Sequence, residues 1–371
     1  MKRLTLGDVC KKESSNIAQK DLQDKKGAYP IYGASGLIKQ VDFYQQDKEY
    51  IAVVKDGAGI GRTMLLPAYS SVIGTMQYLL PKEGIPIDIK YLFYAVEHMN
   101  LAKYFSGATI PHIYFRDYQK EPINIPDIET QRKISQIFGK IDALITSRKE
   151  QRTKLDQIVK SRFIEMFIGK GYPTKTVNEV SRGKGEYGAQ SASTEYDPSR
   201  PRYVRITDIN DDGTLNNDMV TSVNLDDDEQ YRLEYGDFMF ARMGATVGKT
   251  YAFIVGNQIF AGYLIRYKLN PKLINPRYLF WYTKLDEYWN WVKLNQSGAA
   301  QPGINAKKYG SLRIPVPPME LQDQFAAFVA QTDKSKYRQE KCIRFFQCLE
   351  KTLDRSGYDV EFWLSQNEKR I

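Results

Sequence analysis

One internal repeat limits the possible folds of this chain more than any single motif does. The stretch SGATIPHIYFRDYQKEPINIPDIETQ at 106–131 recurs as SGAAQPGINAKKYGSLRIPVPPMELQ at 297–322. At a constant shift of 191 (302 − 111 for the two prolines), residues 106–142 and 297–333 align without a gap and are identical at 11 of 37 positions. A repeat of this kind indicates that one structural unit is used twice. We therefore expect a tandem duplication with pseudo-twofold symmetry.

A long helix is predicted after each copy of the repeat. Around the first, Pro126 and Asp127 favour a helix start, and Gly169 favours a helix end. The apolar positions between them have helical spacing: Ile134, Ile137, Phe138, Ile141, Leu144, Ile145, Leu155, Ile158, Val159, Phe163, Met166 and Phe167. This stripe fades across 148–154. At 1.5 Å per residue the helix spans roughly 60 Å, so we expect it to join two bodies.

The second helix is predicted at 320–354, and its stripe also fades at the centre, between 331 and 341. Its apolar positions are Phe325, Phe328, Val329, Ile343, Phe346, Leu349 and Leu353. Two stripes that both fade centrally suit an antiparallel pair of helices.

Each half also contains a globular region of mixed α+β character. Short β-branched or aromatic runs at 50–54, 62–67 and 78–81 predict strands, followed by a helix at 89–105. The second half has equivalent strands at 238–243, 249–255 and 263–269, followed by a helix from Pro276. The expected domains are 1–125, the long helix 126–171, 172–316, and the second helix with a tail at 317–371.

The order of these segments resembles the specificity subunit of type I restriction-modification systems. A variable region precedes S-G-x-x-x-P, and a strand ending I-x-I-P or I-P-x-P leads into E-x-Q and a long helix, all written twice. The resemblance covers essentially the whole chain. It implies two similar target-recognition domains, joined and spaced by two long antiparallel helices, that bind double-stranded DNA at a bipartite asymmetric sequence.

The same resemblance implies a non-catalytic chain with partners. Two methyltransferase (modification) subunits carrying S-adenosylmethionine would dock on it, and restriction subunits would join through them. This chain itself would bind no cofactor and no metal.

Two glycine-rich loops occupy equivalent places in the halves. Lys55–Arg62 reads KDGAGIGR, and Arg242–Lys249 reads RMGATVGK, at a shift of 187 (244 − 57). Each has a cation at both ends, namely Lys55, Arg62, Arg242 and Lys249. A DNA-facing hairpin, a purely structural turn and a cofactor loop are all compatible with this pattern, although the second loop is one residue too short for a phosphate-binding P-loop.

Further candidates for DNA contact come from loops and from the repeat. Two Tyr-Gly steps resemble recognition loops of the family, and RYVRITDI at 202–209 resembles a strand that its members show. For each tyrosine, packing remains an alternative. Amide and imidazole groups can pair with base edges. The candidates are Tyr32, Gly33, His112, Tyr187, Gln190, Arg205, Gln301 and Asn305.

Composition argues against several other classes of protein. Two histidines and three scattered cysteines do not suggest a metal site. The start MKRLTLGDVC has no apolar core typical of a signal peptide, so we expect a cytoplasmic protein without a membrane span. The net charge of +9 is compatible with a polyanionic partner. Two other functions are alternatives to a specificity subunit. One is a stand-alone DNA adenine methyltransferase, whose N-P-P-Y signature the sequence Asn275–Tyr278 matches imperfectly. The other is a structural coiled-coil adaptor.

Overall fold

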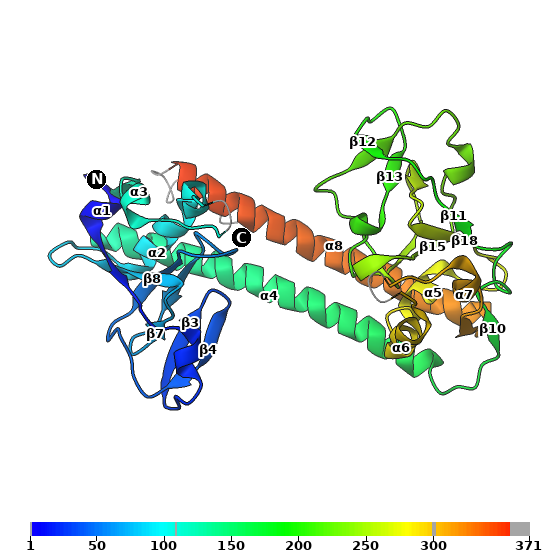
Figure 1. The fold of residues 1–371 in the computed structure, drawn as a ribbon, viewed down its shortest axis with the longest axis horizontal. Helices are drawn as coiled ribbons and strands as arrows, with labels where there is room; N and C mark the ends of the chain where they lie inside the picture. Colours follow the sequence, from blue (N-terminus) through cyan, green and yellow to red (C-terminus); the bar gives the residue numbers. More distant parts are fainter. Residues whose placement is uncertain (1, 108–109, 299–301, 357–371) are drawn as a thin grey trace. The chain divides into compact units, whose positions relative to one another are not determined.

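The chain forms two compact units. The computed structural model describes residues 2–107, 110–298 and 302–356, with side chains described up to residue 348. The first unit comprises Met1–Lys149 and Glu340–Ile371, and the second comprises Glu150–Gln339 (Figure 1). Each unit is a mixed α+β body that includes a part of both long helices.

The first unit is built on one four-stranded sheet with two smaller sheets beside it. The large sheet has the order β2-β8-β5-β6, the hairpin sheet has the order β4-β3-β7, and β1 pairs with β9. The strands are β1 (Lys2–Thr5), β2 (Cys10–Ser14), β3 (Tyr29–Gly33), β4 (Gly36–Val41), β5 (Tyr50–Val54), β6 (Thr63–Leu66), β7 (Ser71–Val72), β8 (Met76–Pro81) and β9 (Pro122–Ile125).

The second unit repeats the four-stranded sheet and the pairing of the opening strand, but it has two separate strand pairs in place of the three-stranded sheet. Its large sheet has the order β11-β18-β15-β16, and smaller pairs are formed by β10 with β19, β12 with β14, and β13 with β17. The strands are β10 (Thr174–Thr176), β11 (Glu186–Tyr187), β12 (Ser193–Glu195), β13 (Arg202–Val204), β14 (Thr221–Val223), β15 (Asp237–Ala241), β16 (Thr250–Ala252), β17 (Gln258–Phe260), β18 (Leu264–Lys268) and β19 (Arg313–Pro315).

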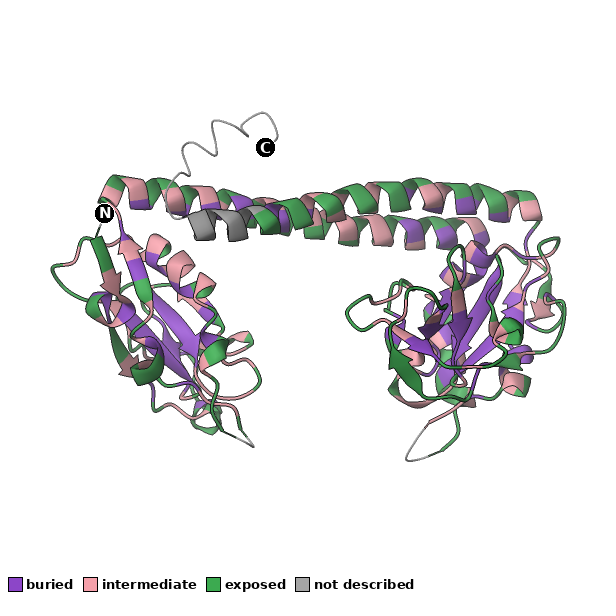
Figure 2. Cartoon of the chain, turned by 90° about the horizontal axis from the view of Figure 1, so that it is seen from above, coloured by how far each residue is buried: buried purple, intermediate pink, exposed green. Residues whose placement is uncertain are grey.

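The two large sheets match strand for strand, which confirms the predicted duplication. In each sheet the first edge strand, β2 or β11, pairs with β8 or β18. That strand pairs with the central strand β5 or β15, which also pairs with the other edge strand, β6 or β16. The opening strand of each half pairs antiparallel with the strand before the long helix, β1 with β9 and β10 with β19. Figure 2 shows that the central strands of both large sheets are mostly buried. Except for Asp237 at the start of β15, the residues of these two strands are apolar or aromatic, and they form part of the cores of the units.

Short helices cover the sheets. They are α1 (Leu6–Val9), α2 (Ile89–His98), α3 (Phe115–Tyr118), α5 (Pro276–Tyr282), α6 (Asp286–Asn295) and α7 (Ala306–Gly310). The short 3-10 turns are η1 (Gln19–Leu22), η2 (Leu101–Tyr104), η3 (Ile206–Asp208), η4 (Glu229–Tyr231) and η5 (Gly244–Thr246). The helix predicted over 89–105 is wrong in extent, because Asn100 takes a left-handed conformation with φ 49° and separates α2 from η2. Asn275 caps α5 and Pro276 occupies its first turn, so this sequence is a helix start.

The two long helices are α4 (Ile128–Phe167) and α8 (Met319–Ser356). In the first unit Phe138, Ile141 and Ile145 of α4 pack with Ile343 and Phe346 of α8. In the second unit the later part of α4 packs with the early part of α8, through Val159, Phe163, Phe167, Phe325 and Val329. The order of these contacts makes the helices antiparallel, as predicted.

Two parts of the predicted stripes need comment. Ile158 was expected to be buried, but it is 51% exposed. Val159 and Phe163, which are four residues apart on one helix face, pack into the core of the second unit. Ile158 lies about 100° away around the helix, on the neighbouring face. The side chains of Leu349 and Leu353 lie outside the described residues.

A buried glutamine joins each long helix to its globular region. The Gln131 side chain accepts from the Asp88 backbone N–H at 2.8 Å and donates to the Pro86 and Pro126 carbonyls at 3.1 and 2.9 Å. Gln322 makes the same three bonds in the second unit, and both residues are fully buried. The glutamine of the repeated E-x-Q motif therefore links the long helix to the end of the preceding strand and to the loop that leads into α2 or α5.

Candidate nucleic-acid interface

The two glycine-rich loops are tight turns that connect antiparallel strands. The turn 55–62 joins β5 to β6, and the turn 242–249 joins β15 to β16. Gly61 and Gly248 are equivalent and have φ values of 79° and 90°, which side chains disfavour. A Cβ atom at Gly61 would lie 2.4 Å from the Ala102 nitrogen, and one at Gly248 would lie 2.9 Å from the Trp289 ring. Each turn therefore packs closely against a helical segment of its own unit, η2 in the first and α6 in the second.

The two S-G segments of the repeat, 106–112 and 297–303, have their described ends directly beside these turns. In the first unit Ser106 and His112 pair through their backbones, and the Gly57 N–H donates to the Pro111 carbonyl at 2.9 Å. In the second unit Ser297 and Gly303 pair in the same way. The equivalent Gly244 N–H donates to the Pro302 carbonyl, also at 2.9 Å. The described ends of this repeated segment are therefore held against the glycine turn in both units. Gln301 lies outside the described residues.

In the first unit the turn and the S-G segment bring Lys55 and His112 to one carboxylate. Lys55 pairs with Asp56, and the His112 Nδ1 lies 2.7 Å from the other oxygen of Asp56. Burial alone would raise the pKa of Asp56, but the hydrogen bonds from Lys55 and His112 outweigh it and hold this pKa below its ordinary value. Arg62, at the far end of the turn, donates to the Ala34 carbonyl at 2.9 Å.

A cavity of about 480 Å³ opens beside this cluster. Lys12, Arg116 and Tyr114 line it together with Lys55 and Asp56. The Arg116 guanidinium lies 4.8 Å from the centre of the Tyr114 ring, which is 46% exposed. Cations interleaved with an exposed aromatic ring are typical of nucleic-acid interfaces. Lys12, Tyr114 and Arg116 were not predicted from the sequence, although Tyr114 and Arg116 lie in the run HIYFR (112–116), which begins with the candidate His112.

Tyr32 and Gly33 lie in the strand β3 next to the same turn. Tyr32 is half-buried and packs against an apolar cluster that contains Tyr50 and Tyr78. Gly33 is buried, and a Cβ atom there would lie 3.0 Å from the Ile38 side chain. Both residues thus have packing roles, and their contact with DNA stays a prediction.

In the second unit Tyr187, Gln190 and Arg242 come together. The Arg242 guanidinium lies 4.8 Å from the centre of the Tyr187 ring, which is 40% exposed on β11. The Gln190 side chain packs beside Gly262, where a Cβ atom would lie 3.0 Å from its Cγ. Asn305 follows the S-G segment and caps α7 by accepting from the Lys308 N–H at 2.9 Å. The side-chain oxygen of Asn305 is therefore already in use.

Lys249 and Arg205 bind loop residues of the second unit instead of joining this group. The Lys249 ammonium lies 2.7 Å from Asp211 and lowers the pKa of that carboxyl below its ordinary value. Arg205 was predicted to lie in a strand, and this is wrong because β13 ends at Val204. The Asp208 carboxylate bonds both the Arg205 backbone N–H, at 2.9 Å, and its guanidinium, so the chain turns there into η3.

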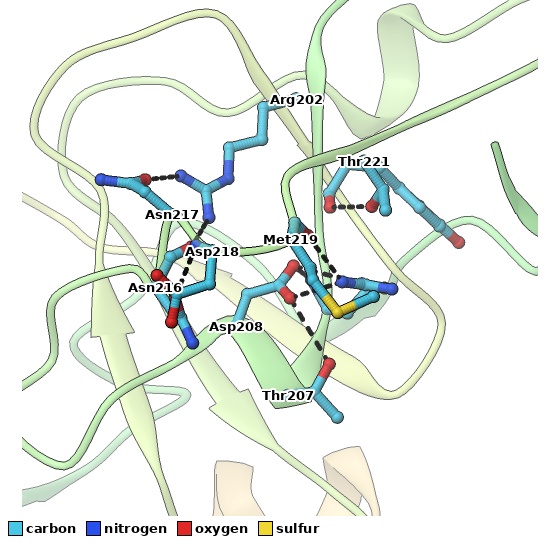
Figure 3. Close-up of polar contacts among 10 residues, drawn as sticks. Arg202, Thr207, Asp208, Asn216, Asn217, Asp218, Met219 and Thr221 are labelled. Carbon is cyan, nitrogen blue, oxygen red and sulfur yellow. Dashed lines mark hydrogen bonds and ion pairs between the residues drawn. The ribbon is translucent and has the colours of Figure 1, made fainter. Parts of the chain in front are cut away.

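The loop that follows is held by a second arginine. Arg202 donates to the side chain of Asn217 at 2.7 Å and to the backbone carbonyl of Asn216, as Figure 3 shows. Figure 3 also shows the Thr207 hydroxyl next to the Asp208 carboxylate, to which it donates at 3.4 Å. These bonds fix the loop 209–220, which carries the Asp211 partner of Lys249.

Other kinds of site are less well supported. Within residues 2–107, 110–298 and 302–356, no cluster of three histidine, cysteine or acidic side chains could hold a metal ion. Among those same residues, no helix is long and apolar enough to span a bilayer.

The fold and the two matching turns define a duplicated protein whose α+β units carry cations at equivalent ends of their glycine turns. The family of the type I restriction modification DNA specificity domain matches residues 1–157 and 174–343. The chain belongs to this family, as its sequence resemblance predicted, and the family provides DNA target recognition in type I restriction-modification systems.

Individual relatives have low sequence identity to this chain but align with most of its length. The chain is 20% identical over 366 residues to the type I restriction enzyme EcoDI specificity subunit of Escherichia coli, covering 89% of this chain and 80% of that protein. Its fold is similar to the crystal structure of a type I S subunit from M. genitalium, with a TM-score of 0.60 at 15% identity over 95% of this chain and 94% of that one. A chain from a study of type I complex assembly matches with a TM-score of 0.54 at 14% identity, over 95% and 96%.

Proposed function

We propose that this chain recognises a bipartite, asymmetric sequence in double-stranded DNA, with one half-site read by each unit. The observation that carries this proposal is the equivalent assembly of glycine turn and S-G segment in both units. The backbone bonds are the same, whereas the side chains differ, with Lys55 and His112 in one unit and Arg242 and Gly303 in the other. Equivalent frames with different side chains would bind the same kind of ligand and read different bases.

The proposal includes the partners that the family implies. Two methyltransferase subunits, each carrying S-adenosylmethionine, would dock on this chain, and restriction subunits would join through them in the cytoplasm. The chain itself would supply the DNA sequence preference and no catalytic group. The pair of α4 and α8 supports a scaffolding role, because it links the two units through continuous helices.

Selection of bound duplexes from a random library tests the proposal directly. The full chain should enrich two short conserved blocks of unrelated sequence, separated by a gap of constant length. Its affinity should fall linearly in a plot of log K against log salt, as expected for contacts with several phosphates. One contiguous block, or the same block twice, would contradict the asymmetric two-unit reading.

A second measurement separates this function from a stand-alone DNA adenine methyltransferase. Isothermal titration of the full chain with S-adenosylmethionine should give no binding heat, whereas the same titration after methyltransferase subunits are added should give micromolar binding. Clear binding by the chain alone would favour the methyltransferase alternative.

A further inference from the structure

The four cations at the ends of the glycine turns fall into two kinds. The lysines, Lys55 and Lys249, are each paired with a carboxylate. The arginines, Arg62 and Arg242, have no carboxylate within ion-pair distance among the residues whose side chains are described, and each donates to a backbone carbonyl of a neighbouring turn. The arginine is the first cation of one turn and the last of the other. Each unit therefore has, at its glycine turn, one arginine that makes no ion pair with any of the described acidic side chains.

Arg242 is the more strongly positioned of the two. Its guanidinium stacks on the Tyr187 ring at 4.8 Å, and its Nη1 donates to the Gly262 carbonyl at 3.4 Å. Its Nε is buried and has no hydrogen-bond partner in the described part of the chain. The plane of the guanidinium is thus fixed by contacts on its face, while its donors are only partly used by the protein.

The ring that supports Arg242 is itself held by the sheet. The Tyr187 hydroxyl accepts from the Ala306 N–H at 3.2 Å. The preceding residue, Glu186, accepts from the Arg266 Nε at 2.9 Å. Arg266 is 3% exposed and also lies 3.4 Å from the buried Asp237. An ion-pair network that runs from the exposed Glu186 to the buried Arg266 and Asp237 therefore anchors β11 and, through it, the Tyr187 ring.

We propose that Arg242 is a specificity-determining residue that reads a guanine in the half-site bound by the second unit. This inference rests on the proposed DNA-binding function and goes further by naming the residue and the base. Two parallel N–H groups of the guanidinium would donate to O6 and N7 of the guanine in the major groove, with Tyr187 holding the plane in place.

The fixed plane of Arg242 favours a base over a phosphate. A phosphate is bound by lysine as a point charge as well as by arginine, so it does not require an oriented plane. The O6 and N7 atoms of guanine lie on one edge of the base, and a guanidinium held in a plane can donate to both at once. Stacking on a ring reduces the conformational entropy that Arg242 loses on binding, and this benefit matters most for a contact that depends on geometry.

The test compares Arg242→Lys, which keeps the charge, with Arg242→Ala, which removes it. The full chain of each variant is taken through duplex selection and sequencing, and its affinity is then measured for the selected duplex and for duplexes with the guanine replaced. Arg62→Lys in the first unit and Arg313→Lys, which bonds to Thr174 at the β10–β19 pair, are matched controls. Tyr187→Leu removes the supporting ring and leaves Arg242 in place.

The inference predicts a specific pattern of results. Arg242→Lys should lower discrimination at one guanine position by about ten- to a hundredfold, with the other half-site and the salt slope unchanged. Tyr187→Leu should reduce discrimination at the same position, and Arg62→Lys should leave that position unaffected. Melting temperatures within a few degrees of the parent value would show that each variant is folded.

Two other outcomes are distinguishable. If Arg242→Lys keeps the full base preference while Arg242→Ala weakens all duplexes equally, Arg242 contacts a phosphate; the inference is then wrong while the proposed function stands. If the parent chain binds no duplex with sequence preference, the proposed function itself fails.

Discussion

Replacing Gln322 by leucine should destabilise the second unit, because this buried side chain satisfies three backbone groups at once. It accepts from the Asn275 N–H at 2.9 Å and donates to the Leu273 and Pro317 carbonyls at 3.1 and 2.8 Å. Leucine has a similar volume but no polar atoms, so one N–H and two carbonyls lose their partner. The buried N–H costs about 1 to 3 kcal/mol, and the two carbonyls, which tolerate the loss better, together cost about 1 kcal/mol.

These contributions give a loss of about 2 to 4 kcal/mol in the free energy of unfolding of this unit. For a body of this size the loss corresponds to a melting temperature lower by about 4 to 16 °C. Calorimetry of the full chain measures this shift, with Gln331→Leu as the control because Gln331 is exposed on the same helix. Gln131→Leu should act in the same way on the first unit. A loss for Gln322→Leu below about 0.5 kcal/mol, no larger than that of the control, would refute the argument.

Three further predictions concern the turn, the acidic partner and the helices. Gly248→Ala should lower the melting temperature of the second unit for two reasons, namely its φ of 90° and the close contact of the new Cβ atom with Trp289. Gly236→Ala has a similar φ of 89° but open space around it, so it should cost only about 1 kcal/mol in the free energy of unfolding. Equal losses for the two variants would contradict the role of the close contact. The pKa of Asp56 is lowered in the folded state, so the parent should be more stable than Asp56→Asn near neutral pH, and thermal melts should show this difference shrinking below about pH 4; a difference independent of pH would argue against the pairing. Four residues inserted in 148–154, matched by four near Ser335, should lengthen the gap between selected half-sites by about one to two base pairs; a fixed gap in an active variant would mean that the helices do not set the spacing.

The fold could be predicted well because an internal sequence repeat indicates that one structural unit occurs twice. The recurrence at 106–131 and 297–322 indicated the duplication, and the apolar stripes indicated the two antiparallel helices. Smaller features depended on tertiary contacts. Ile158 fits a helical stripe by its spacing, but only the position of the domain core decides which side of a wide stripe is buried. Asn100 breaks a helix that the apolar pattern alone would continue.

The candidate site could be predicted only in part, for a physical reason. Turn residues such as Lys55 and Arg242 are recognisable from glycine spacing, because glycine is needed where φ is positive. Whether a cation is neutralised depends on distant residues. Asp211, which pairs with Lys249, comes from a loop that the Arg202 bonds hold in place, and no local pattern connects the two. The role of Gln322 was likewise hidden, because its three partners are backbone groups.

The central claim is that each unit reads its own half of the target, and an exchange of one unit tests it most directly. Residues 174–316 are replaced by the equivalent segment of another family member with a different known target, and the chimaera and the parent are compared by duplex selection. We predict that one conserved block changes to a half-site of the donor protein, while the other block is retained. If both blocks change, or neither does, the units do not read DNA independently and the account is contradicted.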